Sequence, residues 1–297
     1  MAYSLNGTQW FGVGSSNLFG SLTGGIGVCS GIFSSSTLSS NTLAYSTNNG
    51  TTWTGLGTSI FTIQGNGICY GNSLYISTGN GSPSLLERMV LTGINTLAYS
   101  SNGTQWTGLG TSIFTLIGNN VIWSSSNNRF VAVGVGLNTV AYSSNGTQWT
   151  GLGTTIFDYQ GIGISWSGNY FVANGYGIST TMAYSMNGST WTGIGTSFFS
   201  IVGNFTSSQI INNSDNTLAY SNTNNGTTWT GLGSSIFLQT NSIIYGNNLF
   251  IAVGTGSNSI AYSFNGTQWI GLGITVFGCG IDIAYNNNYS FVAARFK

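Results

Sequence analysis

Three features of this 297-residue sequence predict an all-β fold, a seven-bladed β-propeller of four-stranded antiparallel blades. One motif, Ala-Tyr-Ser followed by Asn, Gly and Trp, occurs seven times, with 38 to 53 residues between successive Trp. Each copy holds four short strand-like runs. The chain also begins and ends inside a copy, so its two ends together complete one blade. We therefore expect residues 1–297 to form a single domain.

The strand signals are clear within one copy. Thr96 to Ser100 is an apolar-rich run, Asn102-Gly103 is the dipeptide best suited to a tight type I′ hairpin, and Thr104 to Leu109 reads as the returning strand. A second hairpin is clearest in the last full copy, where Ile243 to Tyr245 and Leu249 to Val253 flank a turn. Each copy therefore predicts two hairpins.

The phase of the repeat favours a ring over an open solenoid, which is the structural alternative. The chain starts at a third strand and stops after a second strand. We expect the C-terminal segment 281–296 to supply two inner strands and the N-terminal segment 1–13 to supply two outer strands of one shared blade. Such pairing opposes fraying, because separating the ends would unpair backbone groups.

Helices are nearly excluded, because 46 glycines and abundant Ser, Thr and Asn interrupt any apolar pattern of helical period. The exception is Ser84 to Thr92, which has room for one helical turn. It lies in the insertion Gly79 to Gly93, the only element that breaks the symmetry of the copies. Glu87 and Arg88 in this insertion are the candidate contact loop, with a tolerated surface loop as the alternative.

Charge is the most unusual bulk property. Only 3% of the residues are charged, and four basic residues balance four acidic ones. No basic patch can form, so the sequence predicts no nucleic-acid partner and no recruitment to an anionic membrane. A surface covered by Ser, Thr, Asn and Gly lacks charge repulsion, and we expect a tendency to self-associate.

The side chains that most catalytic and metal sites need are scarce. The chain has no His, which excludes Ser-His-Asp and Cys-His arrangements. Cys29, Cys69 and Cys279 fall in apolar runs and read as buried free thiols rather than metal ligands. We predict that the protein is not an enzyme and binds no cofactor and no metal.

The first residues, Met1 to Gly14, contain no basic residue and no apolar run, and they already carry a repeat motif. They do not resemble a secretory signal, and no run of about 20 apolar residues suggests a membrane span. We expect a soluble protein made in the cytoplasm.

The motif resembles a known repeat. Ser46-Thr47-Asn48-Asn49-Gly50-Thr51-Thr52-Trp53 is similar to the Asp-box, or bacterial neuraminidase repeat, whose usual form is Ser-x-Asp-x-Gly-x-Thr-Trp. All seven copies have Asn where that family has Asp, and five are one residue shorter. The resemblance implies a propeller in which the box forms the turn between third and fourth strands, on the face opposite the usual active site.

In this family the box is structural. Asn accepts backbone N–H groups much as Asp does, Gly supplies a positive φ, and Trp fills the wedge between blades. The residues assigned to this structural motif are Asn6, Gly7, Trp10, Asn48, Gly50, Trp53, Asn102, Gly103, Trp106, Asn145, Gly146, Trp149, Asn187, Gly188, Trp191, Gly226, Trp229, Asn265, Gly266 and Trp269.

Sialidases of this family hold the substrate carboxylate with three arginines. Here Arg88 lies in the insertion, Arg129 in a turn between first and second strands, and Arg295 near the C-terminus. The only Glu is Glu87, with no evident Tyr beside it to activate. The resemblance therefore implies no sialidase chemistry, and it leaves function open because Asp-boxes also occur in sorting receptors and assembly factors.

Two functions remain. The first is a structural or protein-interaction scaffold, self-associating or part of a virion, since Asn-rich, low-charge repeats are similar to proteins of giant viruses. The alternative is a lectin-like propeller that binds a neutral glycan. Trp123 and Trp166 stand outside the boxes, but they align with Tyr70 and Tyr245, which favours a core role. We expect a binding site on the face of the second-to-third-strand loops and blade-to-blade connections.

Overall fold

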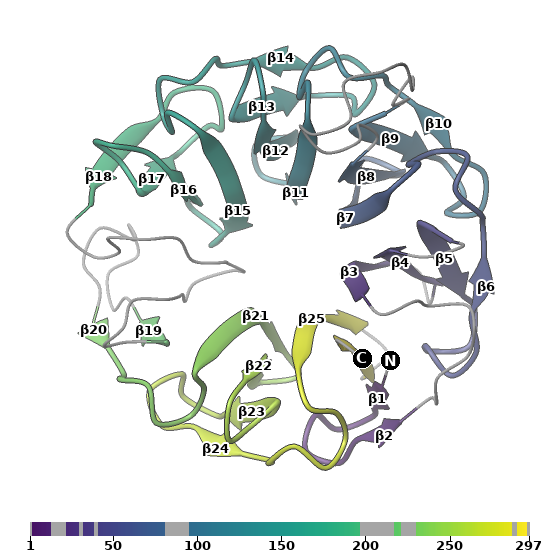
Figure 1. Cartoon of the computed structure of the whole chain (residues 1–297), viewed down its shortest axis with the longest axis vertical. Helices are drawn as coiled ribbons and strands as arrows, with labels where there is room; N and C mark the ends of the chain where they lie inside the picture. The colour runs from purple at the N-terminus through teal and green to yellow at the C-terminus, as the bar shows by residue number, and fades with distance from the viewer. Residues whose placement is uncertain are drawn as a thin grey trace.

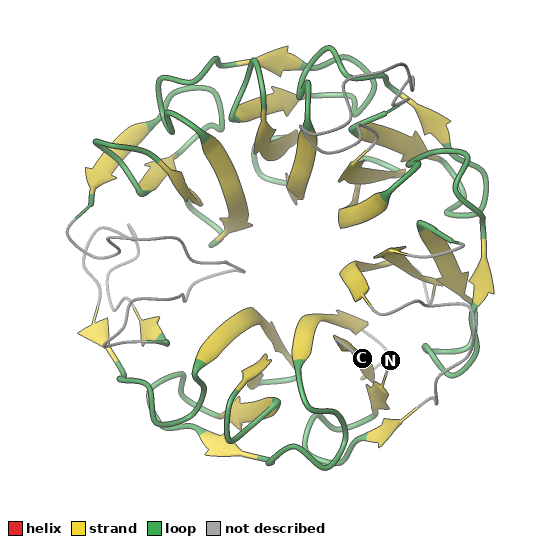
Figure 2. Ribbon diagram, in the orientation of Figure 1, coloured by secondary structure: helices red, strands yellow, loops and turns green. Residues whose placement is uncertain are grey.

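The computed structural model describes residues 2–12, 22–29, 32–38, 41–80, 95–196, 217–220, 230–286 and 290–295. Within these ranges the regular structure consists of strands, and every strand pairing is antiparallel (Figure 2). None of the described residues forms a helix that is long and apolar enough to cross a membrane. The predicted all-β class is confirmed.

The strands form units of four in chain order, each pairing with the next. The first complete unit along the chain consists of β3(Leu22–Cys29), β4(Ile32–Leu38), β5(Leu43–Ser46) and β6(Thr54–Gly55), and the second of β7(Gln64–Gly71), β8(Leu74–Asn80), β9(Leu97–Ser100) and β10(Thr107–Gly108). The third consists of β11(Ile117–Ser124), β12(Arg129–Val135), β13(Val140–Ser143) and β14(Thr150–Gly151), and the fourth of β15(Gln160–Trp166), β16(Phe171–Tyr176), β17(Met182–Ser185) and β18(Thr192–Gly195). A further complete unit consists of β21(Gln239–Gly246), β22(Leu249–Thr255), β23(Ile260–Ser263) and β24(Ile270–Gly271).

These units stand around a common axis, as Figure 1 shows, with β3, β7, β11, β15, β21 and β25 on the inside and the short fourth strands on the rim. One further unit is described only at the pair β19(Ala219–Tyr220) and β20(Thr230–Gly231). The arrangement is that of a β-propeller. Its count of seven blades stays a prediction, because this unit is described in part.

The two ends of the chain share one sheet. Its strand order is β2(Phe11–Gly12), β1(Ala2–Ser4), β26(Ser290–Arg295) and β25(Gly280–Asn286). Ala2 pairs with Ala293 and Ser4 with Phe291. The predicted pairing of N-terminal outer strands with C-terminal inner strands is therefore present, and both termini lie beside this sheet (Figure 1).

The predicted type I′ turn is wrong. Gly103 has a φ of +75°, but Asn102 is not among the residues with positive φ, which a type I′ turn requires at both positions. The returning strand is also shorter than predicted, since β10 spans only Thr107–Gly108. The physical reason is that the Asn102 side chain accepts the N–H groups of Thr104 and Gln105, so these two groups cap a wider loop instead of extending the hairpin.

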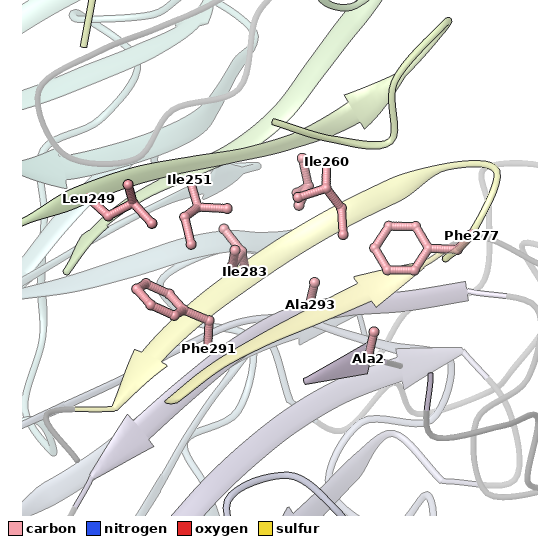
Figure 3. Packing of buried hydrophobic residues seen from close by; sticks show 9 residues of the cluster. Ala2, Leu249, Ile251, Ile260, Phe277, Ile283, Phe291 and Ala293 are labelled. Carbon is pink, nitrogen blue, oxygen red and sulfur yellow. The ribbon is translucent and has the colours of Figure 1, made fainter. Parts of the chain in front are cut away.

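The core lies between neighbouring units. Figure 3 shows one such cluster, in which Leu249, Ile251 and Ile260 of one unit meet Phe291 and Ala293 of the unit that joins the chain ends. The Phe that follows each box is buried wherever its side chain is described, at Phe61, Phe114, Phe157, Phe237 and Phe277. Each wedge is thus filled by one large side chain and by aliphatic residues from both sides.

Asparagine side chains join neighbouring units on both sides of these cores. On the inner strands, Asn66 Nδ2 donates to Gly118 O at 2.8 Å and Asn119 Nδ2 donates to Gly161 O at 2.6 Å. At the start of the third strand, Asn95 Oδ1 accepts from Gly110 N–H at 2.8 Å, and its Nδ2 donates to Ile60 O of the preceding connection at 2.9 Å. Neither set was predicted.

Candidate interaction faces

The box turns form the first candidate face. In one of them, Ser143 Oγ accepts from Gly146 N–H at 2.9 Å, and Asn145 Oδ1 accepts from the two N–H groups that follow Gly146, at 3.1 and 2.9 Å. Trp149 Nε1 donates to Gly146 O at 3.0 Å. The same pattern occurs in the turns of Asn6, Asn102, Asn187 and Asn265. The polar groups of each turn therefore bind the turn itself.

The one described turn with the longer box is closed by a related pattern, in which the Asn side-chain oxygen accepts one backbone N–H and Thr51 N–H donates to Asn48 O at 3.3 Å. Asn48 Oδ1 accepts from Thr52 N–H at 2.9 Å, and Gly50 N–H donates to Ser46 Oγ at 3.0 Å. Trp53 Nε1 donates to Gly50 O at 2.9 Å. The additional residue, Asn49, takes a φ of +58° and absorbs the extra length.

The box also contacts the neighbouring unit. Trp149 packs against a core cluster that contains Ile76 of the preceding unit and Phe130 of its own. Trp10 and Trp191 occupy the equivalent place in their wedges. Gly266, Gly103, Gly7 and Gly188 have φ between +74° and +80°, like Gly146. The wedge position proposed for Trp agrees with these contacts.

Several predicted residues lie outside the described ranges. They include Gly226 and Trp229 of the sixth box and the contact-loop residues Glu87 and Arg88. The exceptional helical segment 84–92 also falls there.

Arg129 is the first residue of β12, opposite Ser124, rather than in the turn before it. It lies beside a box turn: Arg129 Nη1 donates to Asn187 O at 2.6 Å, and its guanidinium carbon lies 4.6 Å from the centre of the Tyr142 ring. The side chain links two units, which gives it a structural use.

The described acidic residues belong to different pairs of units, and each accepts a hydrogen bond. Asp158 Oδ2 accepts from Ile178 N–H at 2.6 Å, whereas Asp282 Oδ1 accepts from Ser242 Oγ at 2.5 Å in another pair of units. Across the described ranges, no three His, Cys, Asp or Glu residues come together. Burial raises the pKa of the Cys69 thiol far above its usual value, so at neutral pH this group is protonated and a poor nucleophile.

Trp123 and Trp166 lie at the ends of the inner strands β11 and β15. Trp123 packs on Phe130 with ring centres 4.4 Å apart, and Trp166 packs on Phe171 at 4.5 Å. Both are partly buried against core clusters. A Cβ on Gly71 of the preceding unit would overlap the Trp123 ring. These contacts agree with the predicted core role.

The face opposite the box turns carries four exposed apolar side chains on neighbouring segments of two units, which we call the upper patch: Leu137, Tyr159, Tyr176 and Ile178. Their exposed fractions are 67%, 62%, 40% and 76%. Tyr159 N–H donates to Tyr176 O at 3.0 Å, and Asp158 holds the Ile178 backbone beside them. The β12–β15 pairing of Val135 with Gln160 brings the Leu137 loop to the same place.

The upper patch lies on the face where binding was expected, but sequence reasoning did not find its residues. The signal was available in the repeats themselves. Counted from the end of the second strand, the equivalent loop position of the β21–β24 unit is Ser257, where this patch has Leu137 and, in a loop one residue longer, Ile178. A comparison of the copies position by position, rather than a search for shared motifs, would have revealed this replacement of a polar residue by apolar ones.

Comparison with protein-family models and with curated proteins gives no match. Solved structures do match. YCF48 from Cyanidioschyzon merolae aligns with a TM-score of 0.65 at 12% identity, over 100% of this chain and 96% of that chain. The gluconolactonase XC5397 from Xanthomonas campestris aligns at 0.52 and 8% identity, over 95% and 88%, and the designed protein Ika8 at 0.51 and 9%, over 93% and 96%.

These likenesses define the class by fold alone: the chain is a β-propeller, similar over nearly its whole length to propellers of different origin. At such low identities, neither the activity nor the partners of those proteins transfer to this chain. The resemblance of its boxes to the Asp-box gains no support from a family match.

Proposed function

We propose that this chain is a non-catalytic, seven-bladed propeller of the Asp-box type that serves as a protein-interaction scaffold and binds its partner through the upper patch. The observation that carries the proposal is the grouping of Leu137, Tyr159, Tyr176 and Ile178, each at least 40% exposed, on one face. Grouped exposed apolar side chains mark interaction sites on proteins whose surface is otherwise polar. Aromatic residues are also enriched in the centres of such interfaces.

Other observations support a binding role without chemistry. The chain contains no His, and Asp158 and Asp282 each accept a hydrogen bond in different units. The Asn side chains of the box turns are occupied by backbone donors of their own turns. Among the described residues, these carboxylate and amide groups thus contribute hydrogen bonds to the fold.

The experiment compares proteins captured from an extract of the source by the purified chain and by a patch variant. In this variant, Leu137→Ser installs the residue that the β21–β24 copy has in a loop of the same length, so this loop should keep its conformation. Ile178→Ser removes the exposed apolar side chain from the β16–β17 loop, which is one residue longer. We expect a specific partner to be lost by this variant and retained by Leu238→Ser, a matched control at an equally exposed residue. Equal capture by all three proteins would contradict the proposal.

A neutral glycan is the second candidate, and the exposed rings of Tyr159 and Tyr176 favour it, since sugars stack on aromatic faces. A glycan array with the chain and with Tyr159→Ser separates the two functions. Reproducible sugar binding that the variant abolishes would replace the protein partner with a glycan, and turnover of any glycoside would contradict the non-catalytic assignment.

A further inference from the structure

A second set of exposed apolar side chains lies on two neighbouring outer hairpins, in their box turns and fourth strands. It consists of Leu5, Phe11, Phe264 and Ile270, with exposed fractions of 58%, 51%, 70% and 51%, and we call it the rim strip. The residues belong to the outer hairpins β1–β2 and β23–β24. These hairpins follow one another along the rim (Figure 1), and their units share a core cluster.

The repeats provide an internal comparison for this strip. In five copies the residue after the box Trp is Thr, and only here is it Phe11 or Ile270. At the positions of Leu5 and Phe264, two copies have Ser101 and Ser144, and one has Met186, which keeps Thr192 after its box Trp. Two neighbouring units have thus exchanged the same two polar positions for large apolar residues, although the buried framework around them is unchanged.

The strip is held in place by partly buried tyrosines. Tyr3 lies opposite Phe11 in the β1–β2 register, and their rings stack with centres 5.5 Å apart. Tyr262 lies opposite Ile270, and the Phe264 ring meets it edge-on at 5.7 Å. Side chains that are already ordered lose little entropy when a partner covers them.

We infer that the rim strip is a homotypic interface, at which two copies of this chain meet about a two-fold axis. Such an axis places each surface against itself, so a charged surface would repel its own copy. No charged residue occurs in residues 2–12 or 260–271, and the strip escapes this repulsion.

A captured peptide strand fits these features less well than a second copy. The edge strands β2 and β24 are two residues long, so strand addition would form a very short ladder. Side-chain burial must therefore carry the contact, and the strip supplies it on both partners of a two-fold pair. The inference goes beyond the scaffold function, because it involves the rim and not the upper patch.

Sedimentation velocity across a concentration series tests the inference. We expect the chain to form a dimer, and Phe11→Thr with Ile270→Thr to raise the dissociation constant at least about tenfold. The pair Leu5→Ser with Phe264→Ser should act in the same direction. All four changes restore residues that other copies carry in the same turns, which favours correct folding. A chain that stays monomeric throughout, or variants that dimerise as tightly as the parent, would overturn the inference.

Two further proteins keep the result interpretable. Phe11→Lys places a charge against its own copy, so its dimer should be weaker at low salt than at high salt, a difference that misfolding does not produce. The variant that combines Leu137→Ser with Ile178→Ser should form the dimer as tightly as the parent chain. If this variant loses partner capture while still dimerising, the two surfaces are separate; a loss of dimer in this variant would overturn the assignment to the rim.

Discussion

Glycines with a positive φ differ in this chain in the space that a Cβ atom would have. Gly146 and Gly153 have similar backbones, with φ of +76° and +70°. A Cβ on Gly146 would lie 2.7 Å from Ile76 Cδ1 of the preceding unit, whereas a Cβ on Gly153 would meet nothing within 4 Å. The box glycine therefore serves both the turn and the contact between units.

This difference predicts unequal costs. Gly153→Ala should lower the free energy of unfolding by about 1–2 kcal/mol, the usual cost of a left-handed backbone with a side chain. Gly146→Ala should lose a further ~1–3 kcal/mol, because the methyl group overpacks the wedge. Urea denaturation of both variants measures the difference. Equal losses would show that only the backbone conformation matters at the box.

At the level of the elements, asparagine has two separate uses. Asn102 caps its turn as an acceptor, through Oδ1 alone to two N–H groups. Asn95, which is 5% exposed, needs both ends of its amide, since Oδ1 accepts from Gly110 N–H and Nδ2 donates to Ile60 O. Replacement by Asp removes the donor and keeps the acceptors, so it distinguishes the two uses.

Asn102→Asp should change the free energy of unfolding by less than about 1 kcal/mol, because carboxylate oxygens accept the same N–H groups. Asn95→Asp should cost about 2 kcal/mol or more, because a buried carboxylate would face Ile60 O. Those surroundings raise the pKa of the introduced carboxyl in the folded state above the value of about 3.9 that it has in the unfolded chain. The free energy of unfolding of this variant therefore falls as the pH rises from about 3.9 toward the folded-state pKa. Urea midpoints at pH 3 and pH 7 measure this, and a pH-independent deficit would contradict it.

The sequence allowed the repeated elements to be predicted because each depends on local chemistry. Ser, Asn, Gly and Trp of a box lie within one turn, and their contacts can be read from spacing. The links of Asn66 and Asn95 to neighbouring units join residues 52 and 35 positions apart, and no local pattern signals them. The upper patch and the rim strip escaped prediction for a related reason: they are departures from the repeat, and a search for the repeat averages them away.

For the molecule as a whole, the sheet shared by the chain ends is the feature on which the predicted ring depends. Ala2 is fully buried in the cluster that joins β22 to β26, and Ala2, Tyr3 and Ser4 pair with Ala293, Val292 and Phe291. A chain without residues 1–12 would leave one edge of β26 unpaired and expose part of this cluster. Each lost backbone hydrogen bond contributes about 1 kcal/mol, and uncovered apolar area adds to that sum.

We therefore expect removal of residues 1–12 to lower the free energy of unfolding by about 3 kcal/mol or more. A circular permutant that joins residue 297 to residue 1 by a short flexible linker and opens the chain at the exposed connection near Gly153 retains the shared sheet. Its urea midpoint should stay close to that of the parent, because it breaks no strand pairing. If the truncated chain unfolds at the same midpoint as the full chain, the shared sheet does not stabilise the molecule, and closure of the ring must be sought elsewhere.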